Sequence, residues 1–319
     1  MINRKEIALL IVEKLTKEKA SLKDLFYKSK NEIGFFYVDD LLPKELASKI
    51  YHNFPKLTET KQRKNIREHK HVAYQMDKYH SLLEEVIFAF QEKKVVQIVS
   101  EICSLTNILP DENLYAGGLS LMAKDNYLSP HLDNSHDKDR QLWRVLNLLY
   151  YVTPNWKIEN GGNLELWPKG LKENPIEIES GFNRLVVMAT HEKSWHSVNK
   201  VLVDGVRGCV SNYDCSKTPL LYTDNFHITT FRGRPSQKIQ NHLISFDNQF
   251  FFHKSNLKIT LGQLLNKLEE YEKYSIPDIG VKLNTSTYYI RYKYKLSKIL
   301  KPYRSVFLKC SYSKKLLSS

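Results

Sequence analysis

The chain has 319 residues, of which 42% are hydrophobic and 26% are charged, an ordinary balance for a globular protein with one sizeable core or two small domains. Its net charge is +13, but ten Lys and Arg and no Asp or Glu fall within 281–319; the rest is close to neutral, which argues against nucleic-acid binding by the whole molecule. No apolar run approaches the ~20 residues of a membrane span and no secretory signal is evident, so we expect a cytoplasmic protein. The four cysteines lack C-x-x-C spacing, which indicates reduced thiols.

The N-terminal third shows mainly helical patterns. Residues 1–28 carry apolar side chains at helical spacing and are predicted to form one amphipathic helix. An aromatic strand is predicted at 34–38, and acidic residues followed by periodic apolar ones predict a capped helix within 39–54. The charged segment 56–79 is expected to be a solvated loop or weak helix. The strongest helical stripe lies at 82–105.

Between residues 113 and 232 the pattern changes to short strands separated by turn signals such as Asn160-Gly161 and Ser180-Gly181. The predicted strands cover residues 119–124, 142–153, 164–167, 175–178, 184–189, 208–213 and 226–231. Many short strands with regular turns indicate an all-β sandwich or barrel. A further amphipathic helix is predicted at 259–274.

His131 and Asp133 stand two residues apart in an extended segment, so their side chains point to one face and can chelate a metal. A distant histidine would complete the 2-His-1-carboxylate triad that binds iron(II) and leaves coordination positions open. His196 is the candidate, because it follows the apolar run 185–189 and lies in a short loop before the next strand. Arg207, eleven residues later, can hold a carboxylate in a bidentate clamp.

In this order and spacing the chain resembles the iron(II)/2-oxoglutarate-dependent dioxygenases, and within them the prolyl 4-hydroxylase-like group. The resemblance runs from about Asn113 to Pro235. Its landmarks are HLDN at 131–134, LLYYV at 148–152, Asn155-Trp156, the Gly161-Gly162 turn with 163–170, the segment 183–187, His196, and Gly205-Val206-Arg207.

The resemblance implies a mainly β fold with flanking helices (α+β), built on a double-stranded β-helix of the jelly-roll or cupin-like type. Residues 1–112 would form a helical and strand region that supports the barrel, and 113–235 the dioxygenase domain. Residues 236–280 would form a C-terminal helical segment, and 281–319 a basic aromatic tail.

The resemblance also assigns the metal ligands. His131, Asp133 and His196 would hold iron(II) through two imidazoles and one carboxylate. His191 and His136 are rival ligands. The family's spacing between the distal histidine and the basic residue favours His196 over His191, whereas His136 stands in a charged run typical of a solvated loop.

Arg207 would bind the distal carboxylate of 2-oxoglutarate, since burying that group without a cation would cost several kcal/mol. Tyr151 matches a family position whose hydroxyl reaches the same carboxylate. Asn147 lies on the same strand face by alternation and is expected to line the co-substrate pocket. The chain departs from the oxygen-sensing prolyl hydroxylases at 121–122, where those enzymes carry a tyrosine; Tyr127 is nearby and is expected in the loop.

The implied reaction consumes 2-oxoglutarate and O2, releases succinate and CO2, and hydroxylates an unactivated C–H bond, with ascorbate as a candidate reductant. Asp133 favours hydroxylation over halogenation. A prolyl peptide, a glycan, a lipid and an amino-acid derivative all remain open as substrates, with loops 56–79 and 134–143 as the expected determinants. Two alternatives stay open: a zinc or other divalent-metal hydrolase or isomerase on a cupin-like barrel, and an inactive metal-bearing binding module.

The tail at 281–319 interleaves tyrosines with cations. A basic extension that serves solubility is the simplest interpretation. The alternative is peripheral contact with an anionic membrane surface, which would place the protein at the inner face of a membrane.

Overall fold

A computed structural model describes residues 2–237, 240, 241 and 244. The chain divides into two units, Met1–Asn248 and Gln249–Ser319. The predicted helix at 259–274 and the tail at 281–319 lie outside the described residues, as does most of 236–280.

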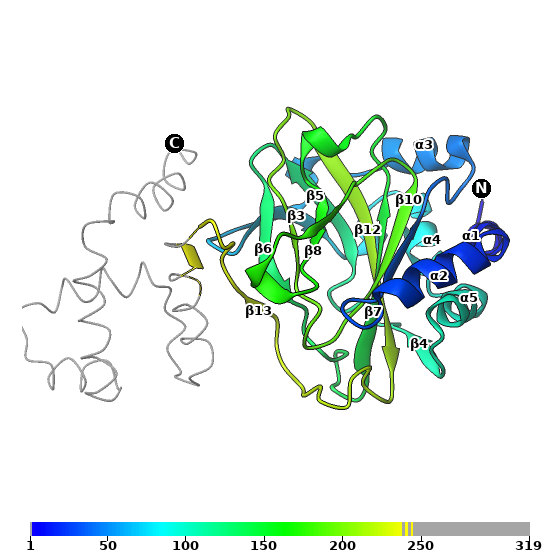
Figure 1. The fold of residues 1–319 in the computed structure, drawn as a ribbon. Coiled ribbons are helices and arrows are strands. Elements are labelled where there is room, and N and C mark those ends of the chain that lie inside the picture. The colour runs from blue at the N-terminus through cyan, green and yellow to red at the C-terminus, as the bar shows by residue number, and fades with distance from the viewer. Residues whose placement is uncertain (1, 238–239, 242–243, 245–319) are drawn as a thin grey trace, which may run out of the picture. The chain divides into compact units, whose positions relative to one another are not determined.

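The described part contains a curled antiparallel sheet. Its strands are β1 (Phe35–Val38), β2 (Lys61–Lys64), β3 (Glu68–Ala73), β4 (Ile108–Pro110), β5 (Gly118–Ala123), β6 (Tyr127–Leu132), β7 (Trp143–Tyr151), β8 (Leu164–Leu166), β9 (Ile176–Ile178), β10 (Arg184–Ala189), β11 (His196–Val198), β12 (Val206–Ser216) and β13 (Thr230–Phe231). From β5 to β12 the chain alternates between two rows of strands, β5-β12-β7-β10 and β6-β11-β8-β9, except that the consecutive strands β8 and β9 pair within the second row. Two facing four-stranded rows connected in this way form a double-stranded β-helix, as predicted (Figure 1).

Helices cover the outer face of the row that holds β7, β10 and β12 (Figure 1). They are α1 (Arg4–Lys17), α2 (Lys19–Ser29), α3 (Lys44–His52), α4 (Ser81–Ala89) and α5 (Lys93–Cys103). Because side chains alternate across a strand, neighbouring tyrosines on β7 separate. Tyr150 packs in the core shared with the helices, whereas Tyr151 packs inside the barrel with Cys209. Both tyrosine side chains are fully buried.

Two predicted single helices are each a pair in the structure. The helix predicted at 1–28 is divided at Glu18, where α1 ends and α2 begins. The backbone of Glu18 is not helical, with φ −102° and ψ 6°. The 82–105 helix breaks before α5, where Glu92 is extended. On one continuous helix the apolar stripes of α4 and α5 would point roughly 140° apart at 100° per residue, so the break lets both face the core. The cap predicted within 39–54 is also wrong in detail, since Pro43 precedes α3 and makes no side-chain cap bond.

The charged segment 56–79 is not a loop or weak helix. It contains the β2–β3 hairpin, and β3 lies between β5 and β6, where it joins the two rows. Its stability comes from backbone pairing with β5 rather than from an apolar face, because β3 carries only Val72 and Ala73 as apolar residues. Periodicity therefore gave no sign of it.

Several other strand predictions need correction. The predicted strand 226–231 is reduced to β13, and β12 extends beyond the predicted 208–213 on both sides. The short strands β4 and β11 are absent from the predicted strands, whereas β6 includes His131 of the segment that was predicted to be extended.

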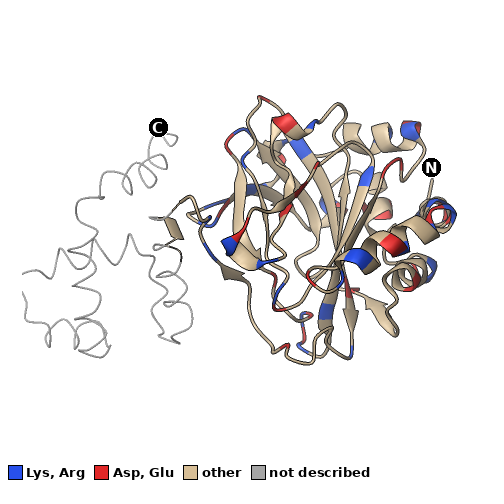
Figure 2. Cartoon of the chain, in the orientation of Figure 1, with Lys and Arg blue, Asp and Glu red and all other residues tan. Residues whose placement is uncertain are grey.

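Charges of both signs are interspersed over the surface in the view of Figure 2. Cys103, Cys209 and Cys215 are buried free thiols. Within the described ranges, no helix combines the length and apolarity needed to cross a membrane.

Candidate active site

Strand pairing brings the two histidines of the predicted triad together. β6 and β11 are antiparallel neighbours, and His131 stands directly opposite His196. Their ring centroids are 4.1 Å apart. The prediction that His196 lies in a loop is wrong, because it is the first residue of β11.

Asp133 follows the end of β6 and turns its carboxylate toward both rings. Its Oδ1 lies 3.5 Å from His131 Nε2, and its Oδ2 lies 3.6 Å from His196 Nε2. One ligand atom from each of the three residues falls within 4.8 Å of the others. Among the described residues this is the one group of His, Cys, Asp and Glu so arranged. The donor set suits iron(II) with open positions.

Backbone carbonyls fix both rings in the orientation that a metal requires. His131 Nδ1 lies 3.0 Å from the carbonyl oxygen of Ser129, and His196 Nδ1 lies 2.9 Å from that of Ser194. A ring nitrogen beside a carbonyl must carry the proton, which leaves each Nε2 as a free lone pair facing Asp133.

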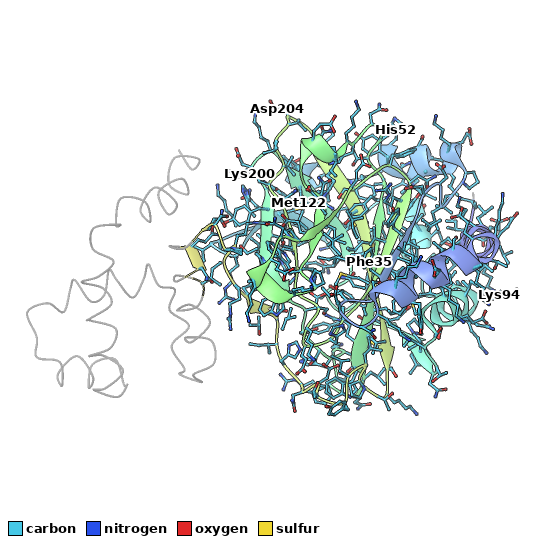
Figure 3. All side chains as sticks on the ribbon, viewed as in Figure 1. Phe35, His52, Lys94, Met122, Lys200 and Asp204 are labelled. Carbon is cyan, nitrogen blue, oxygen red and sulfur yellow. The ribbon has the colours of Figure 1, made fainter. Side chains whose placement is uncertain are left out.

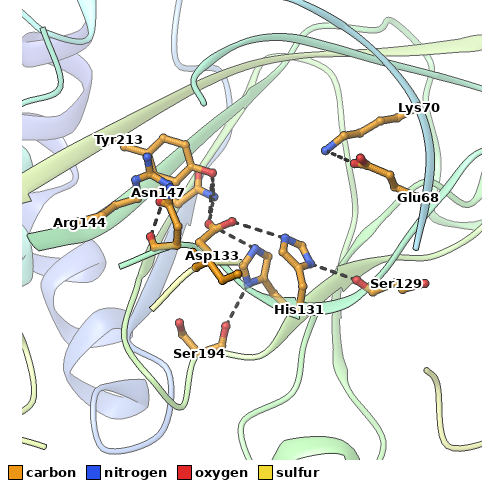
Figure 4. Close-up of polar contacts among 12 residues, drawn as sticks. Glu68, Lys70, Ser129, His131, Asp133, Arg144, Asn147, Ser194 and Tyr213 are labelled. Carbon is orange, nitrogen blue, oxygen red and sulfur yellow. Dashed lines mark hydrogen bonds and ion pairs between the residues drawn. The ribbon is translucent and has the colours of Figure 1, made fainter. Parts of the chain in front are cut away.

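Two side chains hold the carboxylate in place (Figure 4). Asp133 Oδ2 accepts hydrogen bonds from Tyr213 Oη at 3.2 Å and from Asn147 Nδ2 at 3.3 Å. Burial and the neighbouring charge of Asp133 raise the pKa of Tyr213, so its hydroxyl keeps the proton that it donates. Tyr213 was not predicted as a site residue. Asn147, predicted to line the co-substrate pocket, lies within hydrogen-bond distance of the metal-ligand carboxylate.

The electrostatics favour metal binding. Burial alone would raise the pKa of Asp133, but His196 and His131 hold it well below its usual range, so the carboxylate is charged. Burial, with the charge of His131, lowers the pKa of His196 to about 4. At neutral pH the site therefore presents a neutral imidazole at His196 beside an anionic carboxylate, which is the protonation state of metal ligands.

A buried cation lies farther along β12. Arg207 is 3% exposed, its Nε has no hydrogen-bond partner, and none of the described residues forms an ion pair with it. Its guanidinium carbon lies 5.2 Å from the centroid of the Tyr151 ring. Gly162 leaves room beside it, since a Cβ there would come within 3.4 Å of Arg207 Cδ. A buried guanidinium with an open donor fits the carboxylate of 2-oxoglutarate.

The position that departs from the oxygen-sensing enzymes is apolar in the structure as well. Met122, which is labelled in Figure 3, stands opposite Arg207 in the β5–β12 register. It packs against Trp156 and Val198. Tyr127 donates its hydroxyl proton to the carbonyl of Asn65, 3.1 Å away. Neither residue supplies the tyrosine hydroxyl of those enzymes.

The rival ligands lie apart from the triad. His191 Nδ1 accepts a hydrogen bond from the Lys193 backbone at 3.1 Å. His136 Nδ1 contacts the carbonyl oxygen of Asp137 at 2.8 Å. His136 is 5% exposed, so it is buried rather than in a solvated loop.

A double-stranded β-helix with a 2-His-1-carboxylate group and a buried arginine defines an iron(II)-dependent oxygenase site. The sequence supports the same class independently, since residues 117–213 match the family model of the 2OG-Fe(II) oxygenase superfamily. This segment is a domain of that superfamily, and the three clustered ligands and the buried arginine suit iron(II) and 2-oxoglutarate.

Several solved structures are similar to part of this chain at low sequence identity. A prolyl-4-hydroxylase from Pseudomonas putida is 14% identical with a TM-score of 0.47, over 61% of this chain and 98% of that one. A prolyl hydroxylase from Trichoplax adhaerens, in complex with a hypoxia inducible factor peptide, is 17% identical with a TM-score of 0.47, over 63% and 92%. HygX from Streptomyces hygroscopicus, with nickel, 2-oxoglutarate and hygromycin B bound, is 12% identical with a TM-score of 0.43, over 63% and 88%. None of the curated proteins matches this chain.

Proposed function

We propose that this protein hydroxylates an unactivated C–H bond and converts 2-oxoglutarate and O2 to succinate and CO2 in the same turnover. The substrate classes that fit the resemblance are a prolyl peptide, a glycan, a lipid and an amino-acid derivative, and ascorbate is proposed as the reductant. The observation that carries the proposal is the combination of a buried His131–Asp133–His196 group with a buried, unpaired Arg207. A cupin-like hydrolase would use the three ligands but has no role for this arginine.

The residues of the chain would divide the work as follows. His131, Asp133 and His196 would hold iron(II), which supplies the oxidising chemistry when bound together with 2-oxoglutarate and O2. Arg207 would bind the distal carboxylate of the co-substrate. The Tyr151 ring beside Arg207 would restrict where that carboxylate can lie. Orientation and exclusion of water are the protein's contribution, because the cofactors carry out the difficult step.

The test is an anaerobic titration of the iron(II)-loaded protein with 2-oxoglutarate, in which the visible metal-to-ligand charge-transfer band is followed. Removing one partner of a buried charge pair costs about 2–5 kcal/mol, so Arg207→Ala should raise the half-saturating 2-oxoglutarate concentration by at least about thirtyfold. Arg184→Ala is the matched control, because Arg184 pairs with Asp39 on the surface. A wild type with no band but tight zinc binding would refute the proposal and support the hydrolase alternative. Equal titrations of wild type and Arg207→Ala would refute the role of Arg207.

We further propose a cytoplasmic location with peripheral membrane contact through the tail. The support is compositional, since 281–319 contains ten cations and no acids. Each cation near an anionic surface contributes about 1 kcal/mol. Cosedimentation with vesicles containing phosphatidylserine should fall when 281–319 is deleted, and unchanged sedimentation would exclude the membrane contact.

A further inference from the structure

A narrow cleft lies beside the metal-ligand carboxylate. Asp133 borders it, and so do Trp143, Arg144, Thr190, His191, Asp224 and His227. Asp224 and His227 come from the segment after β12, beyond the part that matches the family model. Asp224 Oδ1 accepts the backbone N–H of Glu192 at 3.0 Å, which fixes this segment against the barrel. One wall of the cleft thus lies outside the matched segment, whereas Arg144, Thr190 and His191 lie within it.

Arg144 is the arginine that lines the cleft. It is 3% exposed, and its Nε has no hydrogen-bond partner. The rest of its guanidinium is held: Nη2 donates to the Tyr115 carbonyl at 2.8 Å, and Cζ lies 3.9 Å from the centroid of the Tyr213 ring. The cation is therefore fixed in orientation with one donor left open.

No acidic group among the described residues neutralises Arg144 by an ion pair. Asp133 lies nearby, but its charge would be shared with the metal. Asp224 uses both oxygens for backbone N–H groups, of Glu192 and of Leu221. Asp111 is buried near Arg144 but is not within ion-pair distance of it, and its Oδ2 has no partner. A buried cation without a paired anion is costly unless a ligand supplies one.

Other polar groups at the cleft can complete a ligand site. Thr190 Oγ1 is buried and has no hydrogen-bond partner. Because His191 Nδ1 accepts a hydrogen bond from the Lys193 backbone, its ring proton is on Nε2 and available as a donor. Three donors, from Arg144, Thr190 and His191, therefore border one small cleft.

This cleft is distinct from the place of 2-oxoglutarate. Arg144 stands opposite Cys215 on β12, eight residues beyond Arg207. At about 3.3 Å per residue this separates the two arginines by roughly 25 Å along the strand, more than their side chains and one short dicarboxylate can span. One short dicarboxylate therefore cannot pair with both arginines.

We propose that the cleft binds the primary substrate through an anionic group, carboxylate or phosphate, that pairs with Arg144. One tyrosine ring, that of Tyr213, separates this cation from Asp133, so the hydroxylated C–H bond lies close to the anionic group. The narrow cleft suits one small terminal group of the substrate, such as a carboxylate or phosphate, rather than the whole molecule. This inference rests on the proposed function, because it names the substrate class of the same site.

The test measures binding rather than turnover. The full chain is loaded with nickel(II) and saturating 2-oxoglutarate, then titrated calorimetrically with matched pairs: N-acetyl amino acids against their amides, and sugar 6-phosphates against the parent sugars. We expect at least one acid or phosphate to bind at least tenfold more tightly than its neutral partner. Arg144→Gln should weaken that binding at least tenfold, Arg144→Lys should weaken it less, and Arg184→Gln should bind as the wild type does.

The two series also distinguish a carboxylate from a phosphate as the bound group. Binding by the N-acetyl amino acids alone would indicate a carboxylate, and binding by the sugar phosphates alone would indicate a phosphate. Neutral partners that bind as well as the anions, anions that bind wild type and Arg144→Gln equally, or a panel in which no anion binds would each overturn the inference. If Arg144→Gln fails to fold, Thr190→Val takes its place and should weaken anion binding severalfold, and equal binding would count against the site. Absence of the charge-transfer band in the wild type would instead refute the proposed function.

Discussion

The hydrogen bond from Tyr213 to the metal-ligand carboxylate leads to a test of how the site is held together. Tyr213→Phe removes only the hydroxyl that lies 3.2 Å from Asp133 Oδ2. The ring that stacks on Arg144 remains. The change therefore isolates the orientation of the carboxylate from packing.

The expected effect follows from the hydrogen bonds that remain. A hydrogen bond to a charged group contributes about 1.5–3 kcal/mol, but Asn147 still donates to the same oxygen at 3.3 Å. Loss of a partner that orients a metal ligand typically weakens metal binding by about 10–100-fold. We expect the iron(II) dissociation constant to rise within that range.

The assay is anaerobic competition for iron(II) against a chromophoric chelator, with the melting temperature as a second readout. Tyr150→Phe is the matched control, because Tyr150 is buried on β7 and donates to Asn183 Oδ1 at 2.8 Å on the other face of the sheet. Both variants should lose stability, but only Tyr213→Phe should lose metal affinity. Equal iron(II) affinity of the two variants would refute the orienting role of Tyr213.

Two further predictions concern stability. Burial, with the charge of Asp111, raises the pKa of Asp214 to about 8, so between pH 4 and 8 the folded state holds a proton that the unfolded state has lost. This contribution is fully present below the unfolded pKa and is lost as pH rises through 8, with a slope of about 1.4 kcal/mol per pH unit. In urea unfolding, Asp214→Asn should become progressively more stable than the wild type from pH 5 to 7, and parallel profiles would contradict this. Gly161 has φ +69°, and a Cβ there would lie 2.0 Å from the Lys200 carbonyl oxygen. Gly161→Ala should therefore lower the free energy of unfolding by more than about 1–3 kcal/mol. An unchanged melting temperature would contradict this prediction.

The barrel and the cluster of His131, Asp133 and His196 could be predicted from the sequence, because short-range patterns of residue types indicate both. Strands such as β10 are long apolar runs, and the spacing of His131 and Asp133 is itself a strand period. The sequence predicts a loop at His196 because β11 has only three residues, which are too few to show a strand periodicity.

Other parts of the site had little or no local signal. The carbonyls that orient the two histidines belong to the backbone of Ser129 and Ser194, and any residue type provides a carbonyl. Tyr213 could have been found by alternation, since it lies six residues after Arg207 on one strand and so shares its face. Arg144 could not have been found in this way. Its importance depends on the absence of an acidic side chain within ion-pair distance in the described structure, which the sequence does not show.

The place of β3 between β5 and β6 has a consequence for how the fold can be divided. The segment that matches the family model starts at residue 117, well after β3. A fragment cut there would expose the facing edges of β5 and β6, and unpaired strand edges invite association between copies. By pairing with these two edges, the hairpin at 61–73 protects the barrel against aggregation. It does so although its charged sequence shows no strand pattern.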